Sequence, residues 1–501
     1  MTKPPKISNQ KNFRRLFQMN AKTKQNEVAQ NRVSTKLLMI VLVLSSLLAA
    51  ITVDMVNPVL GLISESLQAS KAQVSWVVTG ITLLLAIGIP LFGRMSDFIE
   101  LRKLYTLATS VLSIGSLICV LAPSLPVLVF GRMVQGAGMS AIPVLSVVAV
   151  SKVFAEGKRG AALGVVAGCI GIGTAFGPIF GGVVGQTWGW SALFWITFIL
   201  SLLIVVGSIF ALPGIKPVIV GGTERRFDLA GGTLLGLTVG LFLLGVTQGE
   251  STGFTSFSTL GSLLGSLFSL IGFIWRIGMA SNPFVPPVLF KNRFYVNSVV
   301  VAFLSAFAYF AVLVFVPLLN LEVNELTPGE AGLTLLPGGA AVALLSPLVG
   351  RISDRVGTKT LIVTGLIVMG ISTFFLSTFA SGASPILSSV GVMGAGIAFA
   401  FVNSPATNSA VGVLQKDMVG VGMGFFQGAF FLGAGTGASL IGAFLHARRD
   451  ANFPLNPMYG LDAINYSDSF LVVTNAVIFA LIASFALKND KKGSRSAKPS
   501  K

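Results

Sequence analysis

The chain has 501 residues, of which 53% are hydrophobic and only 11% are charged, and its formal net charge is +17. So few polar side chains cannot cover a soluble globule of this size, which excludes a water-soluble protein. The single histidine, the two cysteines inside apolar runs and the lack of any catalytic constellation outside those runs argue against an enzyme or a metal site.

Fourteen apolar segments follow one another along the chain, and each is long enough to cross a membrane as a helix. Such a helix needs about 20 mostly apolar residues. The predicted spans cover 37–63, 72–93, 104–122, 125–151, 161–185, 191–213, 229–248, 257–279, 295–320, 330–350, 360–380, 385–411, 419–444 and 469–487. The sequence therefore predicts an all-α polytopic membrane protein.

The distribution of basic residues predicts the orientation of these spans. With fourteen spans and a cytoplasmic N-terminus, the 35 Lys and Arg fall on the cytoplasmic side except for Lys71, Arg132, Arg448 and Arg449. Cytoplasmic loops are enriched in Lys and Arg, so both termini are expected in the cytoplasm of a cell-membrane protein. The basic tails then account for the net charge by attraction to anionic lipid, and we expect no nucleic-acid partner.

A repeated phrase indicates an internal duplication. "GRMSD" at 93–97 and "GRISD" at 350–354 each follow an apolar run, at the ends of the second and tenth spans. We predict two pseudo-symmetric six-helix bundles plus a two-helix insert. The predicted divisions are a basic tail 1–36, a bundle 37–213, an inserted hairpin with flanking segments 214–294, a second bundle 295–487 and a basic tail 488–501. Parallel repeats around a cavity at the membrane midplane are typical of alternating-access carriers.

The two loops carry candidate conformational residues, namely Gly93 and Asp97 in the first and Gly350 and Asp354 in the second. A short turn of this kind places its Asp near the N-terminus of a neighbouring helix and its Arg near carboxylates. Such contacts form in one state of a rocking transporter and break in the other. The alternative is a basic turn that only fixes the topology.

Asp54 and Arg132 are the clearest ionisable residues well inside predicted spans. Intramembrane charges are costly and mark functional sites by default. Both lie roughly 10–14 Å from the outer ends of their spans at helical rise. We hypothesise that they interact directly or through water and that a proton arriving at Asp54 loosens the pair. The alternative is a fixed ion pair that only holds the bundle together.

The fifth span carries Gly173, Gly177 and Gly181 at four-residue spacing, together with Pro178 and Gly182. The spacing presents one smooth helix face, and proline permits a bend. The prediction is close, sliding contact with the other bundle, and the alternative is a static packing motif.

Polar residues inside apolar spans are candidates for a substrate cavity. The candidates are Asn57, Gln135, Tyr309, Asn320, Asn403, Asn408 and Gln427, with Ser404, Thr407, Phe425, Phe426 and Phe430 near them in sequence. An apolar, aromatic pocket with a few polar groups suits lipophilic cations. Hydrogen bonding between helices is the alternative role of each residue.

Four stretches resemble the major facilitator superfamily, and within it the fourteen-span drug:proton antiporters. The loop 93–103 is similar to the family's loop motif, although Glu100 and Leu101 replace a Gly and an Arg found in many members. "GRMVQGAG" at 131–138 resembles the fourth-span motif and "GTAFGPIFGG" at 173–182 the fifth-span antiporter motif. "NPFVPPVLFKN" at 282–292 resembles the segment after the inserted hairpin.

The resemblance implies the major facilitator fold and proton-coupled export of small amphipathic or cationic drugs by alternating access. It implies no cofactor besides the proton gradient, and as partners a lipophilic substrate, protons and lipid, with the chain as a monomer. The chain also resembles the tetracycline exporters of classes K and L and related multidrug exporters. Those tetracycline exporters have glutamates where this chain has Thr174 and Ala434. We therefore expect a multidrug exporter, with a tetracycline exporter or a metabolite carrier of the same fold as alternatives.

Overall fold

The computed structural model describes residues 35–155, 157–215 and 227–487, and within these ranges every regular element is a helix. The side chains at 71–72, 174 and 250–252 are also outside the description. The predicted tails therefore lie outside the described residues, apart from residues 35 and 36. The boundaries predicted at 213 and 295 stay a prediction.

The first half of the chain forms six apolar crossings. They are built from α2 (Thr35–Asp54), η1 (Asn57–Val59), α3 (Leu60–Ser66), α4 (Lys71–Val74), α5 (Trp76–Met95), α6 (Leu101–Val120), α7 (Leu125–Met139), α8 (Ala141–Val153), α9 (Arg159–Trp188) and α10 (Trp190–Ala211). The first crossing consists of α2, η1 and α3. The regular helix is interrupted at η1 because Pro58 has no backbone N–H to donate. The fourth crossing combines α7 and α8.

The rest of the chain forms a hairpin and six more crossings. The hairpin is α11 (Leu229–Thr252) and α12 (Phe257–Met279). The crossings are built from α13 (Val288–Lys291), α14 (Arg293–Glu322), α15 (Pro328–Leu333), α16 (Leu336–Val356), α17 (Thr358–Phe375), η2 (Leu376–Ala380), α18 (Pro385–Val413), α19 (Val419–Ala447) and α20 (Ile464–Phe485).

The predicted number of spans is confirmed. Thirteen apolar helical segments among the described residues are long enough to cross a membrane, and α9 becomes the fourteenth when its two bent parts count as one span. Those parts, Arg159–Gly173 and Ala175–Trp188, meet at an angle of 43°. Pro178 has no N–H to donate to the carbonyl of residue 174, so the bend falls where one helical hydrogen bond is lost.

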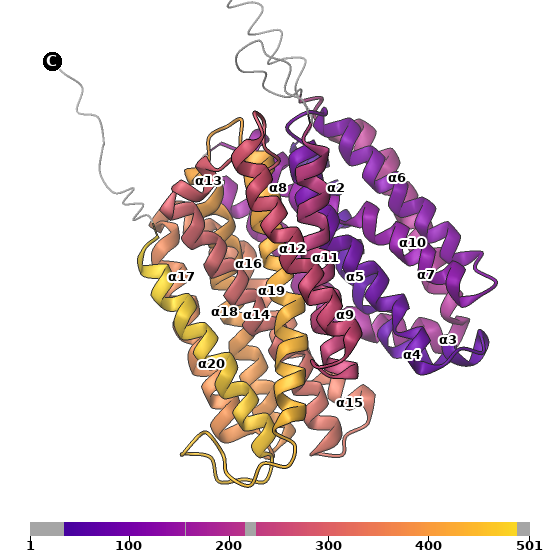
Figure 1. Ribbon diagram of the computed structural model, residues 1–501, viewed down its shortest axis with the longest axis vertical. Coiled ribbons are helices and arrows are strands. Elements are labelled where there is room, and N and C mark those ends of the chain that lie inside the picture. Colours follow the sequence, from indigo (N-terminus) through magenta and orange to yellow (C-terminus); the bar gives the residue numbers. More distant parts are fainter. Residues whose placement is uncertain (1–34, 156, 216–226, 488–501) are drawn as a thin grey trace, which may run out of the picture.

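The two halves of the chain lie side by side, and the inserted hairpin lies at the seam between them (Figure 1). Between the halves, α9 packs against α16 and α18, and α19 packs against α5 and α8. Helix α11 packs against α12 and touches both α5 and α19. The hairpin thus contacts both halves of the molecule.

Candidate functional site: a cavity between two halves and its paired closures

A cavity of about 340 Å³ lies between the two halves, lined by α2, α5, α7, α8 and α9 from the first and by α14, α18 and α19 from the second. Most of its surface comes from aliphatic side chains. The polar residues that line it are Ser46, Asp54, Thr82, Asn403, Ser404, Thr407 and Gln427. Among the described lining residues, Asp54 is the one ionisable group.

Two aromatic side chains, Phe310 of α14 and Phe431 of α19, contribute to the wall. The sequence had singled out their chain neighbours instead. Tyr309 is fully buried and stacks on Phe399 with ring centroids 4.0 Å apart, and Phe430 is buried in the same aromatic cluster. One residue along a helix is a rotation of about 100°, which separates the cavity wall from the helix interface.

Several other predicted cavity residues do not line this cavity. Asn57 is exposed and Asn408 is half-buried, and neither belongs to the lining residues of the cavity. Gln135 is fully buried and donates to Ser116 Oγ at 2.8 Å. Asn320 donates to Thr334 Oγ1 and accepts from Ser388 Oγ, both at 3.3 Å. Gln135 and Asn320 therefore form hydrogen bonds between helices, which is the alternative role given for them above. A buried amide group needs several such partners.

Ser46 and Thr82 line the cavity although the sequence analysis did not select them. Ser46, Ala50 and Asp54 follow one another at four-residue spacing on α2, and all three line the cavity. Residues four apart share a helix face, so the position of Asp54 was a usable signal for Ser46. The sequence contains no comparable signal for Thr82. A threonine in a membrane span most often donates to a carbonyl of its own helix, and Thr82 does so with Val78 O at 2.9 Å.

Arg132 of α7 contacts three other helices of the first half, α2, α5 and α10. Its guanidinium is fully buried, donates to Val77 O of α5 and Thr52 O of α2 at 3.1 Å each, and lies over the Phe194 ring at 5.8 Å. Gln135 accepts a third hydrogen bond at 3.1 Å. The carbonyl of Thr52 belongs to the last turn of α2, where helix carbonyls lack partners and attract cations.

The structure does not join Arg132 and Asp54 by a salt bridge. Both belong to the described residues, and no ion pair within 4.0 Å connects them, although Arg132 binds the backbone two residues before Asp54. Arg132 Nη2 is buried with no hydrogen-bond partner among the described atoms. In this conformation the arginine holds the end of the helix that carries the carboxylate.

The glycine face of α9 packs within its own half, against the prediction that it slides on the other one. A Cβ on Gly173 would collide with Ala50, one on Gly177 would lie 3.1 Å from Asp54 Cβ, and one on Gly181 would collide with the Met55 carbonyl. These glycines therefore let α9 approach α2 beside Asp54. The contact with α16 of the other half is made by a different face of α9, from Gly160 to Ala175.

The two copies of the repeated phrase make equivalent contacts across the halves. Asp97 Oδ2 accepts from Val421 N of α19 at 3.0 Å. Asp354 Oδ1 accepts from Gly160 N at 2.9 Å and its Oδ2 from Ala161 N at 3.0 Å, both in the first turn of α9. Each carboxylate thus satisfies amide groups at the N-terminus of the corresponding helix in the opposite half.

Close backbone contact accompanies each carboxylate. A side chain on Gly93 would collide with Gly424 of α19, and one on Gly350 would collide with Gly160 of α9. We call the contact of Asp97 with α19 the Asp97 closure. Arg94 lies 3.6 Å from Asp97 within it. Burial raises the pKa of Asp97 to about 6, although Arg94 and the α19 amides favour its charged form.

Two helical halves that enclose a cavity and meet through paired, equivalent contacts define a class, the membrane transporters with parallel repeats. The sequence model of the Major Facilitator Superfamily matches residues 42–438, and the chain belongs to that superfamily. It is a multi-pass membrane transporter and not an enzyme.

Two relatives and one solved structure place the chain within its superfamily. It is 30% identical over 395 residues to "Multidrug resistance protein Stp" of Mycobacterium tuberculosis, covering 78% of this chain and 72% of that protein. It is 25% identical over 431 residues to "Riboflavin transporter RibZ" of Clostridioides difficile, covering 86% and 92%. The human organic anion transporter MFSD10 (TETRAN) has the same fold, with a TM-score of 0.64 and 12% identity over 90% of this chain and 99% of that one.

Proposed function

We propose that this transporter exports small lipophilic or amphipathic cations in exchange for protons, by alternating access. The observation that carries the proposal is the cavity, which combines an aliphatic and aromatic wall with one carboxylate among its described lining residues. A carboxylate in an apolar surrounding favours a cation over a neutral or anionic ligand, and it also binds a proton. The relative named as a multidrug resistance protein supports drugs as the exported compounds.

Asp54 is the group at which proton and substrate compete. A cationic substrate in the cavity stabilises the charged carboxylate and releases its proton, while a proton arriving from the other side displaces the cation. Arg132 acts through the end of α2, because its hydrogen bond to Thr52 O holds the turn that carries Asp54. No further cofactor takes part in this cycle, and the transporter works as a monomer in lipid with both termini in the cytoplasm.

The closures at Asp97 and Asp354 supply the conformational part of the cycle. Each joins the end of a span in one half to the first turn of a helix in the other, so both must break when the halves separate at that end. Contacts between a carboxylate and helix amides are strong enough to favour one state and few enough to be broken. In the proposed orientation this end of the molecule faces the cytoplasm.

A metabolite carrier is the second candidate, because the chain is also similar to a protein named as a riboflavin transporter. The composition of the cavity argues against a metabolite carrier, because a flavin would use several hydrogen-bonding groups and the cavity wall is mostly aliphatic. Tetracycline as the specific substrate is also disfavoured. Ala434, one of the two positions where class K and L exporters carry a glutamate, lines the cavity and brings no charge to it.

A substrate panel in proteoliposomes tests the proposal. Purified protein is reconstituted with an imposed pH gradient, and uptake is measured for lipophilic monocations, for riboflavin and for tetracycline. We expect saturable, gradient-dependent uptake of the monocations that a proton-conducting ionophore abolishes. Uptake of riboflavin alone, or uptake of a monocation that ignores the ionophore, would contradict the proposed function.

A further inference from the structure

The two ends of the inserted hairpin are tied together by one buried carboxylate. Asp228 precedes α11 and its side chain is only 3% exposed. Its Oδ1 accepts from Gly231 N at 3.1 Å, which caps α11, and from Arg276 Nε of α12 at 3.1 Å. Its Oδ2 accepts from Phe284 N at 3.1 Å, in the segment that leaves the hairpin. Asp228 thus connects the start of α11, the end of α12 and the segment that follows the hairpin.

The peptide group between Pro283 and Phe284 links this carboxylate to the Asp97 closure. Its N–H donates to Asp228, and its carbonyl, that of Pro283, accepts from Arg94 Nη2 at 3.1 Å. The C=O and N–H of a trans peptide point in opposite directions within its plane, so Asp228 and Arg94 lie at opposite edges of one rigid planar group. Hydrogen bonds at both ends of a peptide group polarise it and strengthen each other.

Arg94 then reaches the closure itself. Its guanidinium lies 3.6 Å from Asp97, and Asp97 accepts from Val421 N of α19. The side chains of Arg94 and Asp97 are each only 6% exposed, so solvent screens this pair little. A continuous series of polar contacts therefore runs from the hairpin base to the first turn of a helix in the other half.

An aromatic series follows the same route. Arg94 lies over the Phe98 ring at 5.0 Å, and Phe98 packs edge-on against Phe227 at 5.5 Å. Phe227 in turn packs edge-on against Phe284 at 5.9 Å, next to the peptide group that holds Arg94. Edge-to-face aromatic pairs stabilise a fixed relative position of their rings. The loop and the hairpin base are thus connected by two sets of contacts that share Arg94 and Phe284.

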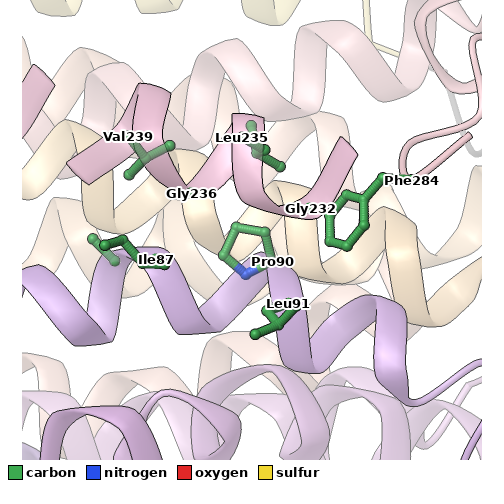
Figure 2. A pocket seen from close by; sticks show the side chains of 9 residues that line it. Ile87, Pro90, Leu91, Gly232, Leu235, Gly236, Val239 and Phe284 are labelled. Atoms are coloured by element: carbon green, nitrogen blue, oxygen red, sulfur yellow. The ribbon is translucent and has the colours of Figure 1, made fainter. Parts of the chain in front are cut away.

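The seam between α5 and α11 leaves little room for independent movement. Figure 2 shows Phe284 beside Gly232 of α11, with Pro90 of α5 below them. The space enclosed there is about 10 Å³, roughly one water molecule. A side chain at Gly232 would lie 3.0 Å from the Phe284 ring, and one at Gly236 3.1 Å from Ile87. The hairpin base is therefore closely packed on the end of α5 that carries the closure.

We propose that Asp228 is a positioning residue for the Asp97 closure. It fixes the peptide group between Pro283 and Phe284, that peptide group holds Arg94, and Arg94 keeps Asp97 in place to bind α19. The inserted hairpin is on this account a coupled part of the closure and not a passive spacer. The inference rests on the proposed function in one respect, since it takes the Asp97 closure to open and re-form during transport.

Pulsed electron paramagnetic resonance measures the closure directly. Spin labels are attached to Lys103→Cys and Gln415→Cys, exposed positions of the two halves near the closure, after replacing Cys119 and Cys169 by serine. Asp228→Asn is nearly isosteric but has one acceptor oxygen, so it cannot bind both Gly231 N and Phe284 N through separate oxygens. Ser256→Ala is the matched control, because Ser256 caps α12 at the opposite end of the hairpin and bonds to Thr259 N.

We expect Asp228→Asn to raise the ratio of open to closed molecules about fivefold, the effect of losing roughly one hydrogen bond. Ser256→Ala should leave that ratio unchanged. Asp97→Ala should also open the closure, and adding Asp228→Asn to it should change nothing further, because the route through Arg94 is already broken.

Three results would overturn the inference. If Asp228→Asn has no more effect than Ser256→Ala while Asp97→Ala opens the closure, the coupling is absent although the closure is real. If the two aspartate variants add independently, the hairpin acts by another route. If Asp97→Ala leaves the distances unchanged, the closure is not a moving part, and the alternating-access mechanism fails together with the inference.

Discussion

Asp97 and Asp354 occupy equivalent positions in the two halves, and each binds the first turn of a helix that belongs to the other half. Asp97 accepts from Val421 N of α19, and Asp354 accepts from Gly160 N and Ala161 N of α9. The two repeats thus exchange the same contact, 257 residues apart in sequence. These two contacts hold one end of the molecule closed. Each of them needs one aspartate side chain and the backbone amides of a helix in the other half.

Removing the carboxylate of Asp354 should open that end of the transporter. Asp354→Ala leaves the buried amides of Gly160 and Ala161 without partners, which costs about 1–3 kcal/mol for an unsatisfied group. We expect a larger open fraction in spin-label distances across the closure and slower substrate transport, with protein yield maintained. A closed fraction equal to that of the native chain would show that the carboxylate does not hold the halves together.

The closure should respond to pH through Asp97. Its pKa is about 6 in the closed structure because burial outweighs Arg94 and the α19 amides, and Lys152 of α8 also faces it. For an Asp97 that becomes exposed when the halves separate, we take the ordinary aspartate pKa of 3.8. Because the pKa is higher in the closed state, protonation favours closure. The closed state therefore gains stability as pH falls from about 6 toward 4 and loses it as pH rises through 6.

The sign of this response follows from the difference between the two pKa values, so the closed fraction should be larger at low pH. Spin-label distances recorded between pH 4.5 and 8 measure it. Asp97→Asn, which stays neutral, should flatten the curve over this range. An unchanged curve in that variant would assign the response to another group.

Adjacent aromatic residues on α19 should behave differently. Phe431 lines the cavity, whereas Phe430 is 2% exposed and packs against Phe310 and Phe399. Phe431→Ala should change KM and the order of preferred substrates while leaving the Tm close to native. Phe430→Ala should lower the Tm, since deleting a buried phenylalanine costs about 3–5 kcal/mol. Equal effects of both variants on substrate preference would contradict the cavity assignment.

The bracing role of Arg132 predicts that a lysine cannot replace it. Lys has one nitrogen and cannot reach Val77 O, Thr52 O and Gln135 Oε1 in the same fork geometry. Arg132→Lys should therefore lower both the Tm and the transport rate although the positive charge remains. Retained stability with lost transport would instead indicate that Arg132 takes part in coupling and is not mainly a brace.

The fold was predictable from the sequence for two reasons. Apolar length marks each membrane span, and the repeated Gly-Arg-x-Ser-Asp phrase marks the duplication that produced two similar halves. The number of spans follows from apolar length, which local breaks such as the one at Pro58 or Pro178 do not hide. The repeat located both closures, because each copy places a carboxylate near the end of a span, where it can bind the N-terminus of a neighbouring helix.

The cavity was only partly predictable. Asp54, Asn403 and Gln427 were found because a polar group in an apolar span must be either functional or paired. Gln135 and Asn320 satisfy the same description but are paired across helices, and sequence alone does not separate the two cases. The helix phase that selects Phe310 over Tyr309 depends on tertiary packing. So does the partner of the α9 glycines, which is α2 and not the other half.

Substrate-triggered proton movement in proteoliposomes tests the central claim, that Asp54 carries the exchanged proton. A pH-sensitive dye inside the vesicles reports proton flux when a transported monocation is added, for the native chain and for Asp54→Asn. The Tm of both proteins is measured in parallel to show that the variant is folded. We expect the native protein to move protons on substrate addition and the folded Asp54→Asn variant to move none. Full substrate-triggered flux in Asp54→Asn would contradict it.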